Sequence, residues 1–352
     1  DEFMQKERKR FHYLFPCLQK HYSHWTELFS KPLLKAIPHL NLTKSVIKIT
    51  KGYFEDERLA IAFSFQSKYL GMSPWECPAA FTMLAYLEHA YGIYHTQGGL
   101  SEISEAMGKV IREQGVDLNL STPVRRIIVE DGVARGVELE SGDRVEADEV
   151  VINADFAWSM DNLVDPGVLR KWRPEKLKKK RFSCSTFMLY LGLDTLYEDV
   201  EHHNIVFAED YKRNLEEIFQ TKELPGDPSF YVRNASVTDP NLAPEGHSAV
   251  YVLVPVPNLQ SDLDWDDIQD DYRDVVLDIM EESVPMPGLR DHIVEEKIIT
   301  PEGWLDDYHV YLGATFNLAH TVSQMMYFRP RNRFEEFDNC YLVGGGTHPG
   351  RG

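Results

Sequence analysis

The segment from Gly98 to Ala154 restricts the fold of this chain most strongly, because its pattern changes from helix to strand in a fixed order. Residues 98–115 read GGLSEISEAMGKVIREQG, and Gly115 is well placed as the C-cap of a helix. Five apolar residues recur there at helical spacing and would share one face: Leu100, Ile103, Met107, Val110 and Ile111. An amphipathic helix is therefore predicted.

Strands are predicted after this helix. VDLNL (116–120) leads to a Thr-Pro pair, and VRRIIVE, VARGVELE and RVEA follow as three short strands turned at Asp131-Gly132 and Ser141-Gly142. A further strand, EVVINA (149–154), closes the unit. Helix, strand, antiparallel meander and returning strand together form the second half of a dinucleotide-binding domain, in which the meander replaces the usual crossover helix.

The charge balance limits the partners. The 352 residues include 37 Lys and Arg against 56 Asp and Glu, a formal net charge of −19. Such a surface repels phosphate backbones, so no nucleic-acid partner is expected, and a bound phosphate would be held mainly by backbone N–H groups. The four cysteines lack the paired spacing of a zinc or redox site, which indicates reduced thiols in a cytoplasmic protein and no bound metal.

The two regions beside the predicted nucleotide unit have their own patterns. Residues 1–90 are predicted to be helical, and aromatic-rich runs such as LAIAFSFQSKYL (59–70) suit either an ordinary core or the wall of a cavity for an apolar ligand. Residues 156–300 contain four strand-like runs and the amphipathic helix WDDIQDDYRDVVLDIMEES (265–283). A mixed sheet floored by that helix would form a substrate domain, with strands that suit a hydrocarbon tunnel and a plain core equally well.

One basic segment stands out from the acidic background. LRKWRPEKLKKKR (169–181) is either a solvated loop or a patch that docks to anionic lipid, where each cation near the surface contributes about 1 kcal/mol and Trp172 would lie at the headgroup level. The residues of this candidate membrane patch are Lys171, Trp172, Lys178, Lys179, Lys180 and Arg181.

The last residues, CYLVGGGTHPGRG (340–352), lead a short apolar strand into three glycines. Glycine has no Cβ, so its N–H groups can approach a ligand closely and its backbone can adopt a positive φ. The run indicates a loop where backbone meets a large ligand, although three glycines also suit a plain flexible turn.

Seven runs in series carry a resemblance to a known family: SPWECPA, EHAYGIYHTQGG, TPVRRIIVEDGVARGV, VVINAD, FNLAH, YFRPRNR and YLVGGGTHPG. In this order they resemble the bacterial phytoene desaturases, FAD-dependent carotenoid desaturases of the amine-oxidase-like flavoprotein group. The resemblance implies an α/β fold with α+β insertions, in which an incomplete Rossmann-like FAD-binding domain of the amine-oxidase and glutathione-reductase type is joined to a substrate domain of mixed sheet and helices.

The resemblance also implies a division of the chain. Residues 1–90 would be the helical part that faces substrate and membrane, 91–155 the FAD-binding domain with its meander, 156–300 the substrate domain, and 301–352 the return to the FAD-binding domain. The first strand and the G-x-G-x-x-G turn would precede Asp1. Residues 1–352 alone are therefore expected to bind FAD weakly or not at all and to be inactive.

Five residues are expected to bind FAD through this resemblance. The backbone of Val124 would read the adenine edge. Gly344, Gly345, Gly346 and Thr347 would pass the ribityl and pyrophosphate groups.

The implied activity is FAD-dependent desaturation of a C30 or C40 polyene of the phytoene kind, with hydride transfer from substrate to flavin, by a cytoplasmic protein peripheral to the membrane that holds the polyene. The catalytic residues are unknown. His95, Asn317 and His320 are the polar residues expected nearest the flavin, each either structural or catalytic. Arg329 and Arg331 could neutralise a cofactor phosphate or pair with the glutamates at 335–336.

Two alternatives of different kind stay open. One is a homologue that binds isoprenoid lipid without redox chemistry. The other is a related flavoprotein that acts on another polyene, such as a retinol saturase or a squalene-derivative desaturase. The sequence gives no indication of the oligomeric state.

Overall fold

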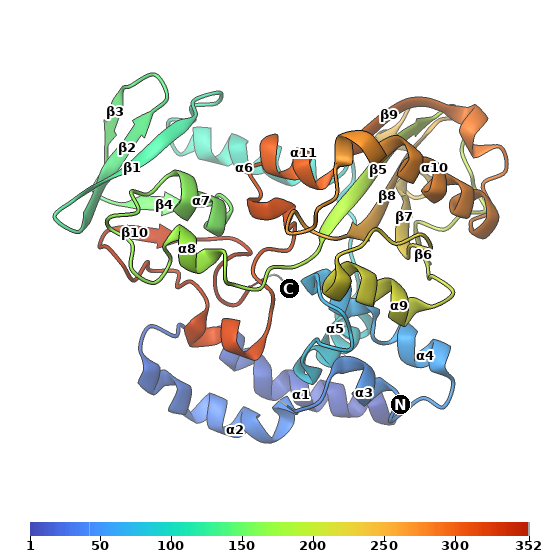
Figure 1. The fold of residues 1–352 in the computed structure, drawn as a ribbon, viewed down its shortest axis with the longest axis horizontal. Helices are drawn as coiled ribbons and strands as arrows, with labels where there is room; N and C mark the ends of the chain where they lie inside the picture. The colour runs from blue at the N-terminus through green and yellow to red at the C-terminus, as the bar shows by residue number, and fades with distance from the viewer. Residues whose placement is uncertain (42, 351–352) are drawn as a thin grey trace.

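The computed structural model describes residues 1–41 and 43–350. Figure 1 shows three regions: a base of N-terminal helices, a group of short strands above it on one side, and a five-stranded sheet with its helices on the other side. The chain visits the strand group twice, before and after the five-stranded sheet.

The N-terminal region is helical, as the sequence predicts. Its helices are α1 (Glu2–Leu18), α2 (Lys31–Leu40), α3 (Val46–Thr50), α4 (Glu57–Ala62) and α5 (Met83–Tyr91), joined in part by the 3₁₀ turns η1 (Trp25–Phe29) and η2 (Phe65–Leu70). Between them a buried ion pair joins Arg10 and Glu7 at 2.6 Å, and the Thr82 hydroxyl donates to Glu7 at 2.7 Å. This polar contact ties α1 to the start of α5 inside an otherwise apolar core.

The predicted amphipathic helix and meander are confirmed. They are α6 (Ser101–Glu113) and the antiparallel strands β1 (Val124–Glu130), β2 (Val133–Leu139) and β3 (Arg144–Glu146). The returning strand β4 (Val150–Ile152) pairs in parallel with β10 (Cys340–Leu342), and α7 (Phe156–Asn162) and α8 (Pro174–Leu177) follow it. Parallel strands bring their carboxyl ends to the same edge, so the segments after β4 and β10 meet there.

The prediction of a strand at 116–120 is wrong. The segment is irregular, and Val116, Leu118 and Leu120 are exposed. A strand needs a neighbour to take up its backbone hydrogen bonds, and no strand of the part of the chain that the structure describes pairs with this segment.

The second sheet contains β5 (Ser185–Leu193), β6 (His203–Val206), β7 (Phe230–Asn234), β8 (Ser248–Val256) and β9 (Ile293–Ile299), in the order β6-β7-β8-β5-β9. The four predicted strands and the helix α10 (Trp265–Ser283) are confirmed, whereas β9 was not predicted. The prediction of a mixed sheet is wrong, because every neighbouring pair is antiparallel.

The connections explain the antiparallel order. The link through α10 carries the chain to the far edge of the sheet, where β9 runs opposite to β5. Trp265, Tyr272 and Val276 of this helix share a buried core with Phe187 of β5 and Val252 of β8. The short helices α9 (Tyr211–Glu216) and α11 (Pro301–Asp306) complete the region.

Candidate active site

The loop after β10 carries the three glycines and passes the end of β4. Gly344 has a φ of +95°, which glycine adopts without strain, and a Cβ added there would lie 3.3 Å from the side-chain oxygen of Asn153, the residue after β4. A Cβ added at Gly346 would lie 2.7 Å from the Cβ of Phe156 and 3.1 Å from the side-chain oxygen of Asn317. Side chains are therefore excluded at Gly346 and disfavoured at Gly344, so the loop presents its backbone to a ligand.

Hydrogen bonds fix the direction of these peptide groups. The Gly344 carbonyl accepts hydrogen bonds from the Thr347 N–H at 3.2 Å and from the Thr347 hydroxyl at 3.0 Å. The Gly345 carbonyl accepts one of 2.9 Å from the Arg329 guanidinium. In a planar trans peptide the N–H points opposite to the C=O, so the Gly345 and Gly346 amides point away from these partners. Neither amide donates a hydrogen bond within residues 1–41 and 43–350.

This loop fits a flavin nucleotide. Two successive amides that point outward can hold a phosphate or another anion without a field of lysines, which suits a chain with a net charge of −19. The loop also lies at the carboxyl edge of the parallel strands β4 and β10, where open α/β sheets bind ligands. Gly344, Gly345 and Gly346 would hold FAD there through the main chain.

The structure places the other two residues expected at FAD in supporting positions. Val124 begins β1, is half-buried and pairs with Leu139 across the meander. The Thr347 side chain is buried and bonded to the Gly344 carbonyl, so it shapes the loop. Direct contact of Val124 or Thr347 with the cofactor stays a prediction.

Two of the three polar candidates come together at the glycine loop. Asn317 lies against Gly346, and the ring of the buried His320 lies where a side chain at Gly350 would go. His95 lies in a different polar cluster, where Asp239 contacts its Nε2 at 2.9 Å and Arg233 its Nδ1 at 2.8 Å. The hydrogen bond from His95, together with the Gly98 amide, lowers the pKa of Asp239 to about 2, so His95 belongs to a hydrogen-bonded cluster apart from the glycine loop.

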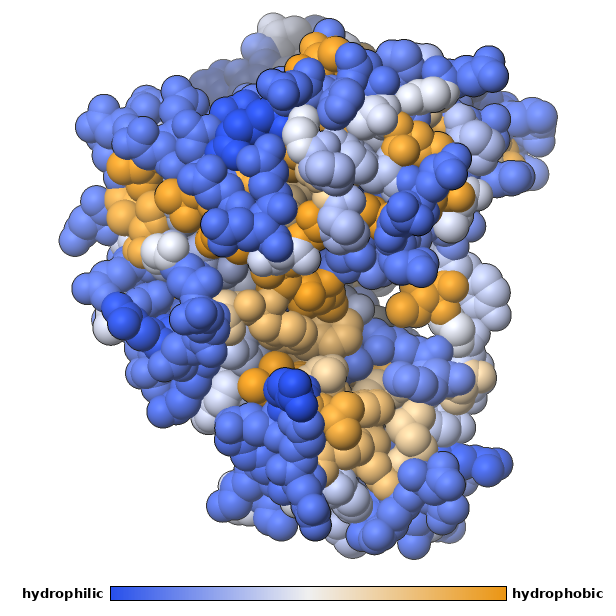
Figure 2. All heavy atoms as spheres, turned by 90° about the vertical axis from the view of Figure 1, so that its right-hand side faces the viewer, coloured by the Kyte–Doolittle hydropathy of each residue, from blue (hydrophilic) through white to orange (hydrophobic). Residues whose placement is uncertain are grey.

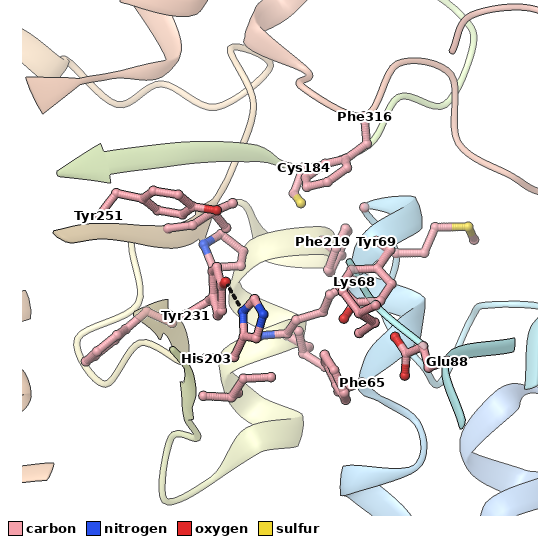
Figure 3. Close-up of a pocket in the computed structure, with 18 residues that line it drawn as sticks. Phe65, Lys68, Tyr69, Glu88, Cys184, His203, Phe219, Tyr231, Tyr251 and Phe316 are labelled. Atoms are coloured by element: carbon pink, nitrogen blue, oxygen red, sulfur yellow. Dashed lines mark hydrogen bonds between the residues drawn. The ribbon is translucent and has the colours of Figure 1, made fainter. Parts of the chain in front are cut away.

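A mostly apolar cavity of about 560 Å³ lies between η2, α5, α9 and one face of the five-stranded sheet. Figure 2 shows apolar side chains gathered in a hollow on this side of the molecule. Figure 3 shows the side chains of Phe65, Phe219, Tyr231, Tyr251 and Phe316 around the cavity. The aromatic run at 59–70 thus contributes to a cavity wall through η2, which was one of the two interpretations of this run.

A few polar groups interrupt this apolar wall. Lys68 is half-buried with its Nζ 5.0 Å from the centre of the Tyr211 ring, and burial lowers the pKa of Lys68 to about 8. The His203 ring is hydrogen-bonded to the Tyr231 hydroxyl at 2.5 Å, as Figure 3 shows. Glu88 accepts a hydrogen bond of 2.9 Å from Gln66. Sequence reasoning missed these residues, although a lone lysine within the apolar run 59–70 was a usable signal.

The cavity and the glycine loop meet at two consecutive residues. Phe316 lines the cavity, while the side chain of Asn317 lies against Gly346. Gly71, on the cavity side, leaves the space that Phe316 uses, because a Cβ there would lie 2.6 Å from the Phe316 ring. A ligand in the cavity and a cofactor on the loop would therefore be neighbours.

One part of the role predicted for the basic segment is wrong: Trp172 does not lie at the headgroup level. Trp172 is 1% exposed, stacks edge to face on Phe156 and donates its indole N–H to Glu335 at 3.0 Å, so it does not reach a headgroup. Its burial depends on partners far away in sequence. Lys178 and Lys179 are exposed, in keeping with either a solvated loop or a charged patch.

The remaining candidate cations have identified partners. Lys171 pairs with Glu335 at 2.9 Å, and Arg181 pairs with Glu76 at 2.6 Å. Lys180 is half-buried, with its Nζ 5.4 Å from the centre of the Trp172 ring. No helix within the described ranges is both long and apolar enough to cross a membrane.

Comparisons with known proteins show the family of this chain. The family described as flavin containing amine oxidoreductase matches residues 9–351. A 4,4'-diapophytoene desaturase (4,4'-diapolycopene-forming) of a Methylomonas species is 55% identical over 352 residues, 100% of this chain and 69% of that protein. An all-trans-zeta-carotene desaturase of Myxococcus xanthus is 41% identical over 305 residues, 86% of this chain and 57% of that protein.

A solved structure supports the fold. The crystal structure of an oxidoreductase from Methanosarcina mazei superimposes with a TM-score of 0.59 at 18% identity, over 95% of this chain and 70% of that one. The chain thus spans between 57 and 69% of the length of the two curated relatives above.

The family match defines a flavin-dependent oxidoreductase, and its structure contains an apolar cavity beside the glycine loop. The chain belongs to the flavin containing amine oxidoreductase family, and its cofactor is FAD. The high identity to carotenoid desaturases confirms the resemblance found in the sequence.

Proposed function

We propose that the whole protein desaturates a C30 or C40 polyene of the phytoene kind. The observation that carries this proposal is the junction at Phe316 and Asn317, where an apolar cavity adjoins the glycine loop. The names of the similar proteins, a 4,4'-diapophytoene desaturase and an all-trans-zeta-carotene desaturase, support the choice of substrate class.

The chemistry divides between cofactor and protein. Desaturation removes a hydride and a proton from a saturated C–C unit; bound FAD would supply the hydride acceptor, and the proton would be released. The protein would exclude water from the apolar cavity and align the chain of the polyene. A cavity of about 560 Å³ is in the range of ordinary ligand pockets, and it would hold the part of a long polyene nearest the flavin.

Substrate delivery would require contact with a membrane, since a polyene of this length partitions into lipid. We include in the proposal a peripheral position at the cytoplasmic face of the membrane, with the exposed Lys178 and Lys179 facing anionic headgroups. Trp172 is not part of this surface. The exposed apolar side chains of the helical base, Trp25, Phe29, Leu34 and Ile37, would be a second contact with lipid.

The test is desaturation by the full-length protein loaded with FAD. Phytoene or its C30 counterpart is supplied in liposomes, and the products are separated and identified by their absorption spectra and masses. We expect products with additional conjugated double bonds. A matched pair of variants checks the site: Leu253→Trp fills the cavity and should abolish conversion, while Val294→Trp, on an exposed position of β9, should not.

Two outcomes would contradict the proposal. Retention of polyene without any product would favour a lipid-binding homologue without redox chemistry. Conversion of only a different polyene, such as a retinol or a squalene derivative, would move the protein to another branch of the family.

A further inference from the structure

Arg329 is a fully buried cation that holds the glycine loop from behind. Its side chain is 0% exposed. Nε donates to the Thr347 carbonyl at 3.0 Å, Nη2 to the Gly345 carbonyl at 2.9 Å, and Nη1 to the Leu318 carbonyl at 3.2 Å. One planar guanidinium thus joins both sides of the loop to the segment that carries Asn317.

These contacts exclude one of the two alternatives that the sequence left open for this residue, pairing with the glutamates at 335–336. Among the described residues, Arg329 has no carboxylate partner, and burial alone lowers its pKa to about 10. The neighbouring glutamates are used elsewhere: Glu335 pairs with Lys171, and Glu336 accepts the backbone N–H groups of residues 171 and 172. Arg329 therefore remains charged at neutral pH without a partner acid.

A fourth carbonyl, that of Gln324, accepts from Nη1 at 3.5 Å. An unpaired buried charge is costly, and four carbonyl dipoles offset only part of that cost. The same contacts, however, turn the Gly344 and Gly345 carbonyls toward Thr347 and Arg329 and leave the amides of Gly345 and Gly346 pointing away from these partners. Amides that point away from a positive charge on the other side of the loop stabilise an anion that they face. A neutral cross-link such as glutamine would join the segments without this effect.

We propose that Arg329 is a positioning residue for the flavin: it orients the glycine loop toward the cofactor and adds positive potential behind the two free amides. Two parts of FAD carry negative charge that this positive potential would stabilise, the pyrophosphate and the reduced isoalloxazine ring. The experiment below distinguishes between them. The inference rests on the flavin half of the proposed function and not on the polyene.

The experiment uses the full-length protein reconstituted with FAD. Arg329→Gln removes the charge, Arg329→Lys keeps the charge but loses the planar fork, and Arg333→Gln is the matched control at an exposed residue that pairs with Asp338. The measurements are the dissociation constant of FAD, the affinity for ADP in competition, the midpoint potential of the bound flavin, and the melting temperature without FAD.

We expect Arg329→Gln to weaken FAD binding about tenfold or more, which corresponds to about 1.4 kcal/mol. Arg329→Lys should lie between it and the wild type, and Arg333→Gln should match the wild type. A parallel loss of ADP affinity would assign the effect to the pyrophosphate. A lower midpoint potential with normal ADP affinity would assign it to the reduced ring.

A merely structural role predicts a different result. If folded Arg329→Gln melts at a lower temperature but keeps normal FAD affinity, ADP affinity and potential, the proposal is wrong. If Arg329→Gln does not fold, Arg329→Lys decides in the same way. A wild type that retains no flavin would overturn the proposed function as well, whereas flavin retention without polyene conversion would overturn only the polyene half.

Discussion

At the scale of single residues, Lys68 is the least expected group in a cavity for a hydrocarbon. It is half-buried, its nearest described aromatic partner is Tyr211, and burial lowers its pKa to about 8. A hydrocarbon that enters the cavity removes more water from the ammonium and so disfavours the charged form further. Binding of the polyene and loss of the Lys68 proton should therefore favour each other.

This coupling predicts the pH dependence of binding. The sign follows from the lowered pKa: the charged form, which prevails below about pH 8, opposes the ligand, so affinity should rise as the pH increases through that value. Lys68→Met, which keeps a similar stem without the charge, should bind more tightly at neutral pH by up to about tenfold, because pH 7 lies about one unit below this pKa, and should lose the pH dependence.

The measurement is a fluorescence-quenching titration of a polyene against the protein at several pH values, with the exposed Lys109→Met as control. A pH profile that Lys68→Met leaves unaltered would show that the ligand does not lie beside this ammonium.

At the scale of elements, the basic segment around α8 is anchored on one side and free on the other. Glu336 accepts the backbone N–H groups of residues 171 and 172 at 2.6 and 3.0 Å, and Lys180 packs over the buried Trp172 ring. The segment is thus not a freely solvated loop along its whole length. Of the residues predicted to form the membrane patch, Lys178 and Lys179 are exposed and have no identified partner among the described residues.

The membrane proposal makes a prediction for this element. Replacing Lys178 and Lys179 with glutamate should reduce sedimentation with anionic liposomes, more at low than at high salt, because exposed charges are screened by ions. The control makes the same change of charge at Lys109 and Lys212, two largely exposed lysines on α6 and α9. An equal loss of sedimentation in both double variants would mean that only the net charge of the protein matters. No loss in the Lys178 and Lys179 variant would leave the segment with a purely structural role.

Elements also show what the sequence could and could not predict. The meander was predictable because its turns are local: Asp131, Gly132 and Gly142 all have the positive φ that such turns need. Strand pairing was not, because an alternating pattern tells which face of a strand is buried but not which strand lies beside it. For the same reason the antiparallel order and β9 escaped prediction.

The site was predictable to a similar degree. The glycine loop follows from local composition, since close backbone approach requires glycine. The burial of Trp172 and the bonds of Arg329 depend on residues that are distant in sequence, such as Phe156 and Leu318. A charged residue read in isolation gives no sign of such contacts.

At the scale of the whole molecule, the region that contains α6, β4 and β10 exposes several apolar side chains. Four apolar residues of α6 and its start are exposed, together with one on β4 and one after β10: Leu100, Ile103, Met107, Val110, Val151 and Val343. Many exposed apolar side chains in one region mark a surface that makes further contacts, and the curated relatives are longer than this chain. We expect other parts of the whole protein to cover this surface and to complete the FAD site.

This expectation is tested by comparing residues 1–352 with the full-length protein. Both are purified, incubated with FAD, freed of excess cofactor and denatured, and the released flavin is measured by its absorbance. The full-length protein should retain about one FAD per chain and residues 1–352 much less, because a helix N-terminus facing the pyrophosphate supplies part of the binding. Equal retention would mean that the glycine loop and Arg329 carry most of the affinity.

The central claim is that a polyene in the apolar cavity gives up hydrogen to the flavin beside the glycine loop. The most direct measurement is a single turnover without oxygen: full-length protein with bound FAD is mixed with phytoene or its C30 counterpart, and the absorption of flavin and polyene is recorded together. The account predicts that oxidised flavin bleaches while one new conjugated double bond appears per flavin, and that Leu253→Trp prevents both changes. Tight binding of the polyene with no bleaching and no new double bond would contradict it.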